Sequence, residues 1–260
     1  MDKHYLTPLF APQSIIVLAD AQESAAATAS YTQSLHEMLC AQRFSGKLTF
    51  IDPQISGTLA DLAQAKADLA IIAVPQEAQL ASLELVGRIG CPTAMIISSG
   101  VDADHARRLH QAAVHAGVHL LGPNSLGIQR PSLLLNAGVM GPLAKDGSLA
   151  LVSQSGALTA SILDWAANNG VGFSSVISLG PHTSLGLPEA LDFLANDGRT
   201  QSIVVYMEGI QNARKFMSAL RSAAGAKPVV VLKAGRKPAS SAAALTHSAA
   251  IVGSDDVFDA

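Results

Sequence analysis

The chain has 260 residues, of which 49% are hydrophobic and only 4% aromatic, and its formal net charge is −3. This length fits one large domain or two of ordinary size, with a core built from Ala, Leu, Ile and Val. The weakly acidic balance argues against nucleic acid and anionic membranes as partners. The apolar runs are too short to span a bilayer, and "MDKHYLTPLF" does not resemble a signal peptide. Two cysteines, Cys40 and Cys91, are too few for a disulfide framework and predict a cytoplasmic location.

Short β-branched runs alternate with Ala- and Leu-rich stretches through the first half of the chain. The spacing is typical of βαβ units and predicts a doubly wound parallel sheet with right-handed crossovers. The expected strands are 14–19, 47–52, 69–74, 93–98 and 119–122, and the expected helices lie near 30–43, 77–90 and 103–117.

The pattern breaks at residues 122–147, which are rich in Gly, Pro and Asn and are predicted to form a linker with functional loops. It then restarts as a second α/β unit. We expect strands at 149–153, 173–180, 202–208 and 228–235, and helices at 154–170, 188–197 and 212–225. The sequence therefore predicts two Rossmann- or flavodoxin-like doubly wound domains in tandem, residues 1–128 and 143–260.

Ligands of open α/β sheets bind beyond the carboxyl ends of the strands. The most informative such segment is "VSQSGALT", where Ser153 and Ser155 offer hydroxyl groups and Gly156 allows close backbone approach at a helix start. A helix N-terminus can bind an anion such as phosphate. Ser155 can equally serve only to cap the helix, and the two roles are compatible.

Two further side chains can carry chemistry. Glu208 ends an apolar strand, where a carboxylate orients a base, holds a cation or is simply solvated. His247 is one histidine in a polar loop, a pattern that usually marks a surface residue. Together with an anion-binding helix start, however, a histidine can act as a covalent nucleophile, and a carboxylate can fix its tautomer. No metal site is predicted.

Seven stretches in family order resemble the NDP-forming acyl-CoA synthetases, the succinyl-CoA synthetase superfamily. The similarity is greatest to ADP-forming acetate–CoA ligases and to the N-terminal part of fused bacterial protein lysine acetyltransferases. The stretches are "LFAPQSIIVL", "DLAIIAVP", "LLGPNSLGI", "LALVSQSGALTASILDWAANNGVGFSSVISLG", "VVYMEGIQNARKF", "KPVVVLKAGR" and "THSAAIVGSDDVFDA". The resemblance implies a CoA-binding domain followed by a ligase domain. The implied reaction converts acyl-CoA, NDP and phosphate reversibly to acid, CoA and NTP.

The resemblance also implies roles for individual residues. His247 would carry the phosphoryl group and Glu208 would orient it. Phosphate would be held by Ser153, Ser155 and Gly156. CoA or acyl-CoA would contact Pro53, Val74, Pro75, Ser98 and Asn124, with Asn124 near the thiol.

Some positions depart from the family pattern. The first loop, "VLADAQESAAATAS", lacks the expected glycines and places Asp20 where it would repel a phosphate. After His247 the chain has Ser248 and Ala249 instead of Thr-Gly. These departures favour an alternative, a degenerate ligase region that senses CoA or acyl-CoA for a lysine acetyltransferase. A nicotinamide-binding Rossmann domain is discounted, because no G-x-G-x-x-G follows the first strand.

The final stretch, "GSDDVFDA", continues in the family as a helix that leads to further domains, including an ATP-grasp unit. The resemblance therefore implies a fragment of a longer protein. We expect ATP or ADP with Mg to act only through an ATP-grasp domain or subunit, and this chain alone to be inactive as a ligase.

Overall fold

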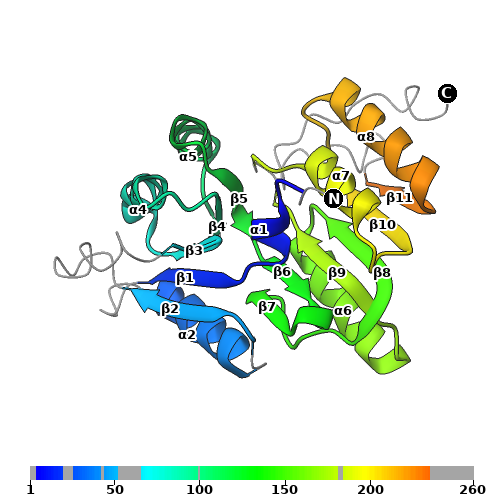
Figure 1. Ribbon diagram of the computed structural model, residues 1–260, viewed down its shortest axis with the longest axis horizontal. Helices are drawn as coiled ribbons and strands as arrows, with labels where there is room; N and C mark the ends of the chain where they lie inside the picture. The colour runs from blue at the N-terminus through cyan, green and yellow to red at the C-terminus, as the bar shows by residue number, and fades with distance from the viewer. Residues whose placement is uncertain are drawn as a thin grey trace.

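The structure, a computed structural model, describes residues 4–19, 26–41, 44–51, 66–98, 100–180 and 184–234, with the backbone alone at 26–32 and 41. Two α/β units lie side by side, each built on its own sheet (Figure 1). The predicted fold class, two such units in tandem, is confirmed.

The first sheet has the strand order β2-β1-β3-β4-β5, and all of its strand pairs are parallel. Its strands are β1 (Ser14–Ala19), β2 (Lys47–Ile51), β3 (Leu69–Ala73), β4 (Thr93–Ile97) and β5 (His119–Ser125). Among the residues that the structure describes, the helices of this unit are α1 (Thr7–Phe10), α2 (Ala26–Ala41), α4 (Gln76–Arg88) and α5 (Ala103–Ala116).

Every residue of β3 and β4 is buried, because both faces of the first sheet are covered. On one face, Ile72 and Ile96 pack against α4 and α5. The opposite face, which includes Ile71 and Met95, faces α2, α1 and the second unit (Figure 1). Continuous apolar runs in the sequence therefore become central strands.

The second sheet has the order β11-β10-β8-β9-β6-β7, and β6 pairs antiparallel with both neighbours. Its strands are β6 (Gly127–Arg130), β7 (Leu135–Gly138), β8 (Asp146–Ser153), β9 (Phe173–Ser178), β10 (Ser202–Met207) and β11 (Val229–Lys233). A short 3-10 helix, η1 (Pro131–Leu133), joins β6 to β7. The α-helices are α6 (Gly156–Asn169), α7 (Leu187–Asn196) and α8 (Ala213–Ala226).

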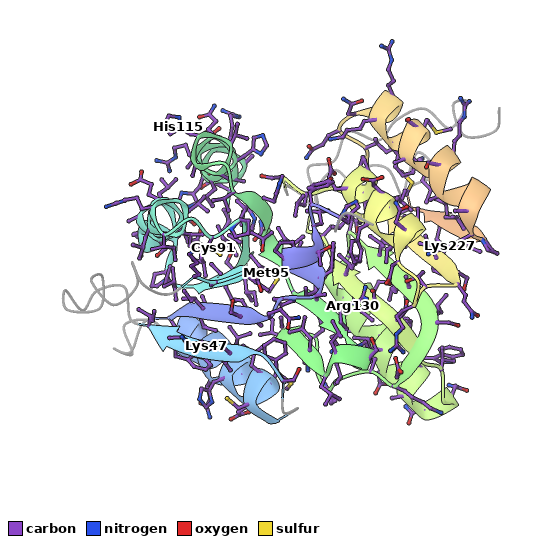
Figure 2. The ribbon with its side chains drawn as sticks, in the orientation of Figure 1. Lys47, Cys91, Met95, His115, Arg130 and Lys227 are labelled. Atoms are coloured by element: carbon purple, nitrogen blue, oxygen red, sulfur yellow. The ribbon has the colours of Figure 1, made fainter. Side chains whose placement is uncertain are left out.

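The expectation of a linker at 122–147 was wrong, because β6 and β7 form an antiparallel hairpin inside the second sheet. The sequence does not indicate these strands, because three of their buried side chains are polar. Gln129 bonds Asn136 and loop carbonyls. Arg130, labelled in Figure 2, lies at the second sheet, and its guanidinium pairs with Asp197 at 3.0 Å. Hydrogen bonding makes such burial tolerable, so polarity here does not indicate a loop.

One apolar cluster joins the two units. It runs from β1 and α2 through Met95, Leu121 and Ile128 to the residues of α7, β10 and α8. The α6 face of the second sheet has its own smaller cluster around Phe173 and Leu163. The two sheets therefore share a core, and the ends of their strands are held in fixed relation. None of the helices among the described residues has the length and apolar character needed to cross a membrane.

Candidate functional site

The carboxyl end of β8 in the second sheet is built by side chain–backbone bonds. Ser153 is fully buried, and its Oγ donates to the Ser155 carbonyl at 2.9 Å and accepts from the Ser155 N–H at 3.1 Å. The Ser153 carbonyl accepts from Leu179 N–H in the neighbouring strand segment. The Ser153 hydroxyl is thus engaged in shaping the turn that leads into α6.

Ser155 is the N-cap of α6, and its Oγ accepts from the Leu158 N–H at 3.4 Å. The capping role is confirmed, while phosphate binding at this helix start stays a prediction. A Cβ on Gly156 would lie only 2.9 Å from Leu126 Cδ1. The glycine is therefore required by packing against the GPNSLG segment, whether or not a phosphate also approaches it.

Gln154, between these two serines, is a residue that the sequence analysis missed. Its Oε1 accepts from the Glu208 N–H at 2.7 Å and from the Gly209 N–H at 3.1 Å, and its Nε2 donates to the Gly209 carbonyl at 3.0 Å. This amide fixes the turn after β10 against the turn after β8. The only feature of the sequence that could have identified Gln154 as a site residue is its position between two serines at the end of a strand.

Glu208 follows directly after β10, is partly buried and has its backbone held by Gln154. Its carboxylate lies close enough to Tyr206 to act on that phenol. Burial raises the pKa of Tyr206 above its ordinary value of 10.0, and the negative charge of Glu208 raises it further. Glu208 therefore lies at the strand edge, and its role as the partner of His247 stays a prediction.

A cavity of about 200 Å³ adjoins this turn. It is lined by Gln154, by the loop 209–212 and by the first residues of α7 and α8. Glu189 accepts from the Gly186 N–H and pairs with the Lys215 ammonium, while Asn212 caps α8 by accepting from the Lys215 N–H. Three helices thus begin at one edge, each with its positive end toward it.

The carboxyl edge of the first sheet has a different character. Val74 is buried, and Pro75 is the N-cap of α4 without a side-chain cap bond. Ser98 follows β4 directly. Its Oγ is buried and has no hydrogen-bond partner among the described residues. An unpaired buried hydroxyl is unfavourable. Contact between Ser98 and a ligand stays a prediction.

Asn124 was predicted to lie near the CoA thiol. Its side-chain amide forms two bonds with the backbone of Val101, donating to the carbonyl at 3.0 Å and accepting from the N–H at 3.2 Å. Asn124 thereby ties β5 to the loop between β4 and α5, the loop that carries Ser98. Each amide group keeps further hydrogen-bonding capacity, so contact with a ligand stays a prediction.

The GPNSLG segment joins the two edges. Ser125 Oγ donates to the Ser178 carbonyl at the end of β9, and Ser178 Oγ accepts from the Leu126 N–H. Gly180 has φ +74°, and a Cβ there would lie 2.5 Å from the Asn124 carbonyl oxygen. Ser98, Asn124 and the turn after β9 are consequently brought together.

Not every predicted site residue can be placed. Pro53 and His247 lie outside the residues that the structure describes, as does Asp20. The described residues bring Val74, Pro75, Ser98 and Asn124 to one edge and Ser153, Ser155, Gly156 and Glu208 to the other. In the whole part of the chain that the structure describes, no group of three His, Cys, Asp or Glu side chains has metal-binding geometry.

Comparison with known proteins gives independent information on the second unit. Residues 146–260 match the family described as "Succinyl-CoA ligase like flavodoxin domain". This match covers the Ser153–Gly156 turn and Glu208.

Curated relatives extend the similarity to the first unit. The chain is 39% identical over 199 residues to the "Acetate--CoA ligase [ADP-forming] I" of Archaeoglobus fulgidus, covering 74% of this chain and 29% of that protein. It is 35% identical over 200 residues to the "Acetate--CoA ligase [ADP-forming] I subunit alpha" of Pyrococcus furiosus, covering 74% and 43% respectively. The chain therefore spans less than half the length of these relatives.

A solved structure shares the arrangement of both units. The "dinucleotide forming Acetyl-coenzyme A synthetase 1" of Ca. Korarchaeum cryptofilum, in complex with phosphate and ADP, superposes with a TM-score of 0.87 at 29% identity. The superposition covers 98% of this chain and 57% of that one. The tandem arrangement of the two sheets is thus shared with a protein that binds phosphate and ADP.

Proposed function

We propose that this chain, which is homologous to the α or CoA-binding region of ADP-forming acyl-CoA synthetases, forms the CoA-binding and phosphohistidine-bearing part of an acid–CoA ligase. The observation that carries the proposal is the meeting of two polar strand edges at the GPNSLG segment. One edge holds the unpaired Ser98 hydroxyl, and the other holds the α6 start and Glu208.

The first edge would bind CoA. Ser98 Oγ would donate to or accept from the pantetheine chain, and Asn124 would hold the Ser98 loop in place through Val101. Pro75 and Val74 would supply apolar contact, and Pro53 belongs to the same proposal. The thioester would lie beside GPNSLG, within reach of the second edge.

The second edge would bind phosphate and its carrier. The α6 start, shaped by Ser153, Ser155 and Gly156, would stabilise the phosphoryl group through helix N–H groups. Phosphate would attack the thioester carbonyl and release CoA, which gives an acyl phosphate. Glu208, held by Gln154, would accept a ring N–H of His247, and the other ring nitrogen would attack the phosphorus of the acyl phosphate and release the acid. Phosphohistidine would then pass the group to NDP bound by an ATP-grasp domain or subunit, which supplies Mg and nucleotide binding.

In the overall reaction, acyl-CoA, phosphate and NDP give acid, CoA and NTP. This assignment fits a cytoplasmic enzyme, and it also fits the two free cysteines, one exposed and one buried.

Calorimetric titration of the 260-residue chain with CoA and acetyl-CoA tests the first edge. We expect micromolar binding that weakens in Ser98→Ala. No binding up to millimolar concentration would contradict the CoA site. The second edge is tested in the longest natural chain that contains this sequence, where His247→Ala should abolish acyl-CoA formation. Unchanged turnover in that variant would contradict the phosphohistidine role.

A second candidate is a degenerate ligase region that senses CoA or acyl-CoA in a protein lysine acetyltransferase. The glycine-free first loop with Asp20 favours it. The fusion itself has less support, because the relatives reported above are named acid–CoA ligases. Binding of acyl-CoA without any ligase turnover in the longer protein would select this candidate.

A further inference from the structure

A chain of hydrogen bonds lies behind the first edge, between α4 and α5. Its Gln79 and His105 side chains are buried, and Arg108 at its outer end is exposed. The imidazole of His105, which is 3% exposed, lies 3.2 Å from Gln79 Oε1 through its Nε2 and 3.2 Å from an Arg108 guanidinium nitrogen through its Nδ1. Gln79, 1% exposed, directs its Nε2 toward the Val74 carbonyl at 3.5 Å. None of these three side chains belongs to the site proposed above.

The donors and acceptors of this chain fit only one arrangement. Arginine can only donate, so Nδ1 of His105 must accept, and the ring is neutral with its proton on Nε2. Nε2–H then donates to Gln79 Oε1, and the Gln79 amide donates to Val74. Donation therefore runs in one direction, from Arg108 through His105 and Gln79 to the Val74 carbonyl.

This relay connects the two loops of the proposed CoA edge. Val74 and Pro75 form the loop after β3, and His105 lies in the first turn of α5. The α5 N-cap, Asp102, accepts from the His105 N–H at 2.8 Å, and the preceding residue, Val101, is held by Asn124. The position of His105 is thus transmitted to both loops. Further along the helix pair, Gly87 and Ala116 pack closely.

We propose that the Gln79–His105–Arg108 relay positions the Val74–Pro75 and Ser98–Val101 loops for CoA, and that protonation of His105 uncouples them. The proposal rests on the CoA site proposed above. A proton on Nδ1 would remove the acceptor for Arg108 and place two cations in contact. Their repulsion would move the ring, and with it the Nε2–H that donates to Gln79. The three residues are positioning residues, because none is proposed to touch CoA.

The charges around the ring favour the neutral form. Burial lowers the pKa of His105 below its ordinary value of 6.5, and the Arg108 charge lowers it further. The Asp102 and Glu77 carboxylates oppose these effects. Since the folded-state pKa is lowered, the contribution of the neutral ring to stability is fully present above about pH 6.5 and is lost as the pH falls through the lower folded value.

Calorimetry with CoA as the probe, between pH 8.0 and 5.0, tests the coupling. The Kd of the wild-type chain should rise below the ring pKa by up to about tenfold per pH unit. His105→Gln, which keeps a donor toward Gln79 but cannot titrate, should bind within about twofold of wild type at pH 7.5. Its pH profile should show only the titration of the CoA phosphate. Coincident profiles for the two proteins would overturn the proposal.

Two further variants distinguish a specific effect of the relay on CoA binding from a general loss of structure. His115→Gln alters an exposed histidine at the far end of the same helix, and its profile should follow wild type (Figure 2). Gln79→Leu should weaken CoA binding about five- to tenfold at pH 7.5, equivalent to one lost hydrogen bond. Thermal unfolding at each pH confirms that each variant is folded. Unchanged affinity in folded Gln79→Leu would count against the relay.

NMR of the chain without CoA gives a readout that does not depend on the proposed function. Imidazole ¹⁵N shifts should report a neutral Nε2–H ring for His105 at pH 7.5. The backbone amides of Gln76 and Val101 should titrate with the same midpoint as this ring. Loop amides that do not follow His105 would reject the coupling. If wild type does not bind CoA while the amides do follow the ring, the CoA site fails and the relay stands.

Discussion

The two strand edges are built in opposite ways. At the edge of the second sheet, Ser153, Gln154 and Ser155 bond the backbone of their own turns and of the neighbouring turn. At the edge of the first sheet, the loops are held by Asn124 on one side and by the relay behind them, and the Ser98 hydroxyl has no partner among the described residues. The second edge is therefore shaped by its own side chains, whereas the first edge depends on contacts from neighbouring elements.

The largest effect is expected where the two edges meet. Gly180→Ala would place a Cβ 2.5 Å from the Asn124 carbonyl oxygen at φ +74°. We expect a loss of about 2–4 kcal/mol in the free energy of unfolding from strain and overlap, together with weaker CoA binding. Urea unfolding measures the first effect. Gly170→Ala is the matched control, because its φ is +67° but nothing lies within 4 Å, so about 1–2 kcal/mol is expected. Equal losses in the two variants would show that the junction is not tightly packed.

The next effect should be confined to the second edge. Gln154→Leu leaves the Glu208 and Gly209 N–H groups without their acceptor. We expect a loss of about 2 kcal/mol in unfolding free energy and unchanged CoA affinity, because the amide does not reach the first edge. Gln211 lies in the loop that carries Glu208 and Gly209, but its side chain is exposed. Gln211→Leu should therefore change the free energy of unfolding by less than about 0.5 kcal/mol. A parallel fall in CoA affinity would show that the edges are coupled through this turn.

Two serine deletions should give opposite results. Ser153→Ala removes two bonds to the Ser155 backbone and should lower the unfolding free energy by about 1–2 kcal/mol. Ser98→Ala removes a hydroxyl that has no partner in the described part of the chain, so stability should stay equal or rise, while CoA affinity falls about five- to tenfold. Denaturant titration and calorimetry on both variants measure these effects. Destabilisation by Ser98→Ala would mean that this hydroxyl already has a structural role.

The smallest effect is a shift in one titration. Since the Glu208 charge adds to burial in raising the pKa of Tyr206, Glu208→Gln should lower that pKa toward 10.0 without reaching it. Ultraviolet absorbance across the alkaline pH range follows the phenol, and Tyr206→Phe identifies its signal among three tyrosines. An unchanged midpoint would indicate that the Glu208 carboxylate points away from the strand edge.

Most of the architecture could be predicted because apolar periodicity reports burial directly. The expected strands at 14–19, 69–74 and 93–98 correspond to β1, β3 and β4 within one residue. The expectation failed at β6 and β7, where three buried side chains are polar. Gln129 and Asn136 bond each other and the Gly141 carbonyl across the hairpin, and Arg130 pairs with Asp197, 67 residues away. The local sequence around Arg130 does not indicate that Asp197 will pair with it. A polar strand was therefore predicted to be a linker.

The candidate site could likewise be predicted only in part. The rule that parallel strands present their carboxyl ends at one edge was enough to gather Val74, Ser98 and Asn124, and separately Ser153 and Glu208. The rule could not assign the bonds of each group. Asn124 bonds Val101, Gly156 is required by Leu126, and Gln154 holds the turn after β10.

The sequence by itself determined the order of the strands and helices other than α1, β6, η1 and β7. It also identified Ser155 as a candidate cap and the edges at which polar groups gather, because these depend on local periodicity and chain direction. Only the tertiary structure decided which groups are already bonded and which are left open. The relay of Gln79, His105 and Arg108 joins two helices through contacts up to 26 residues apart. Burial sets both its protonation state and its hold on the loops, and burial is a property of the packed molecule.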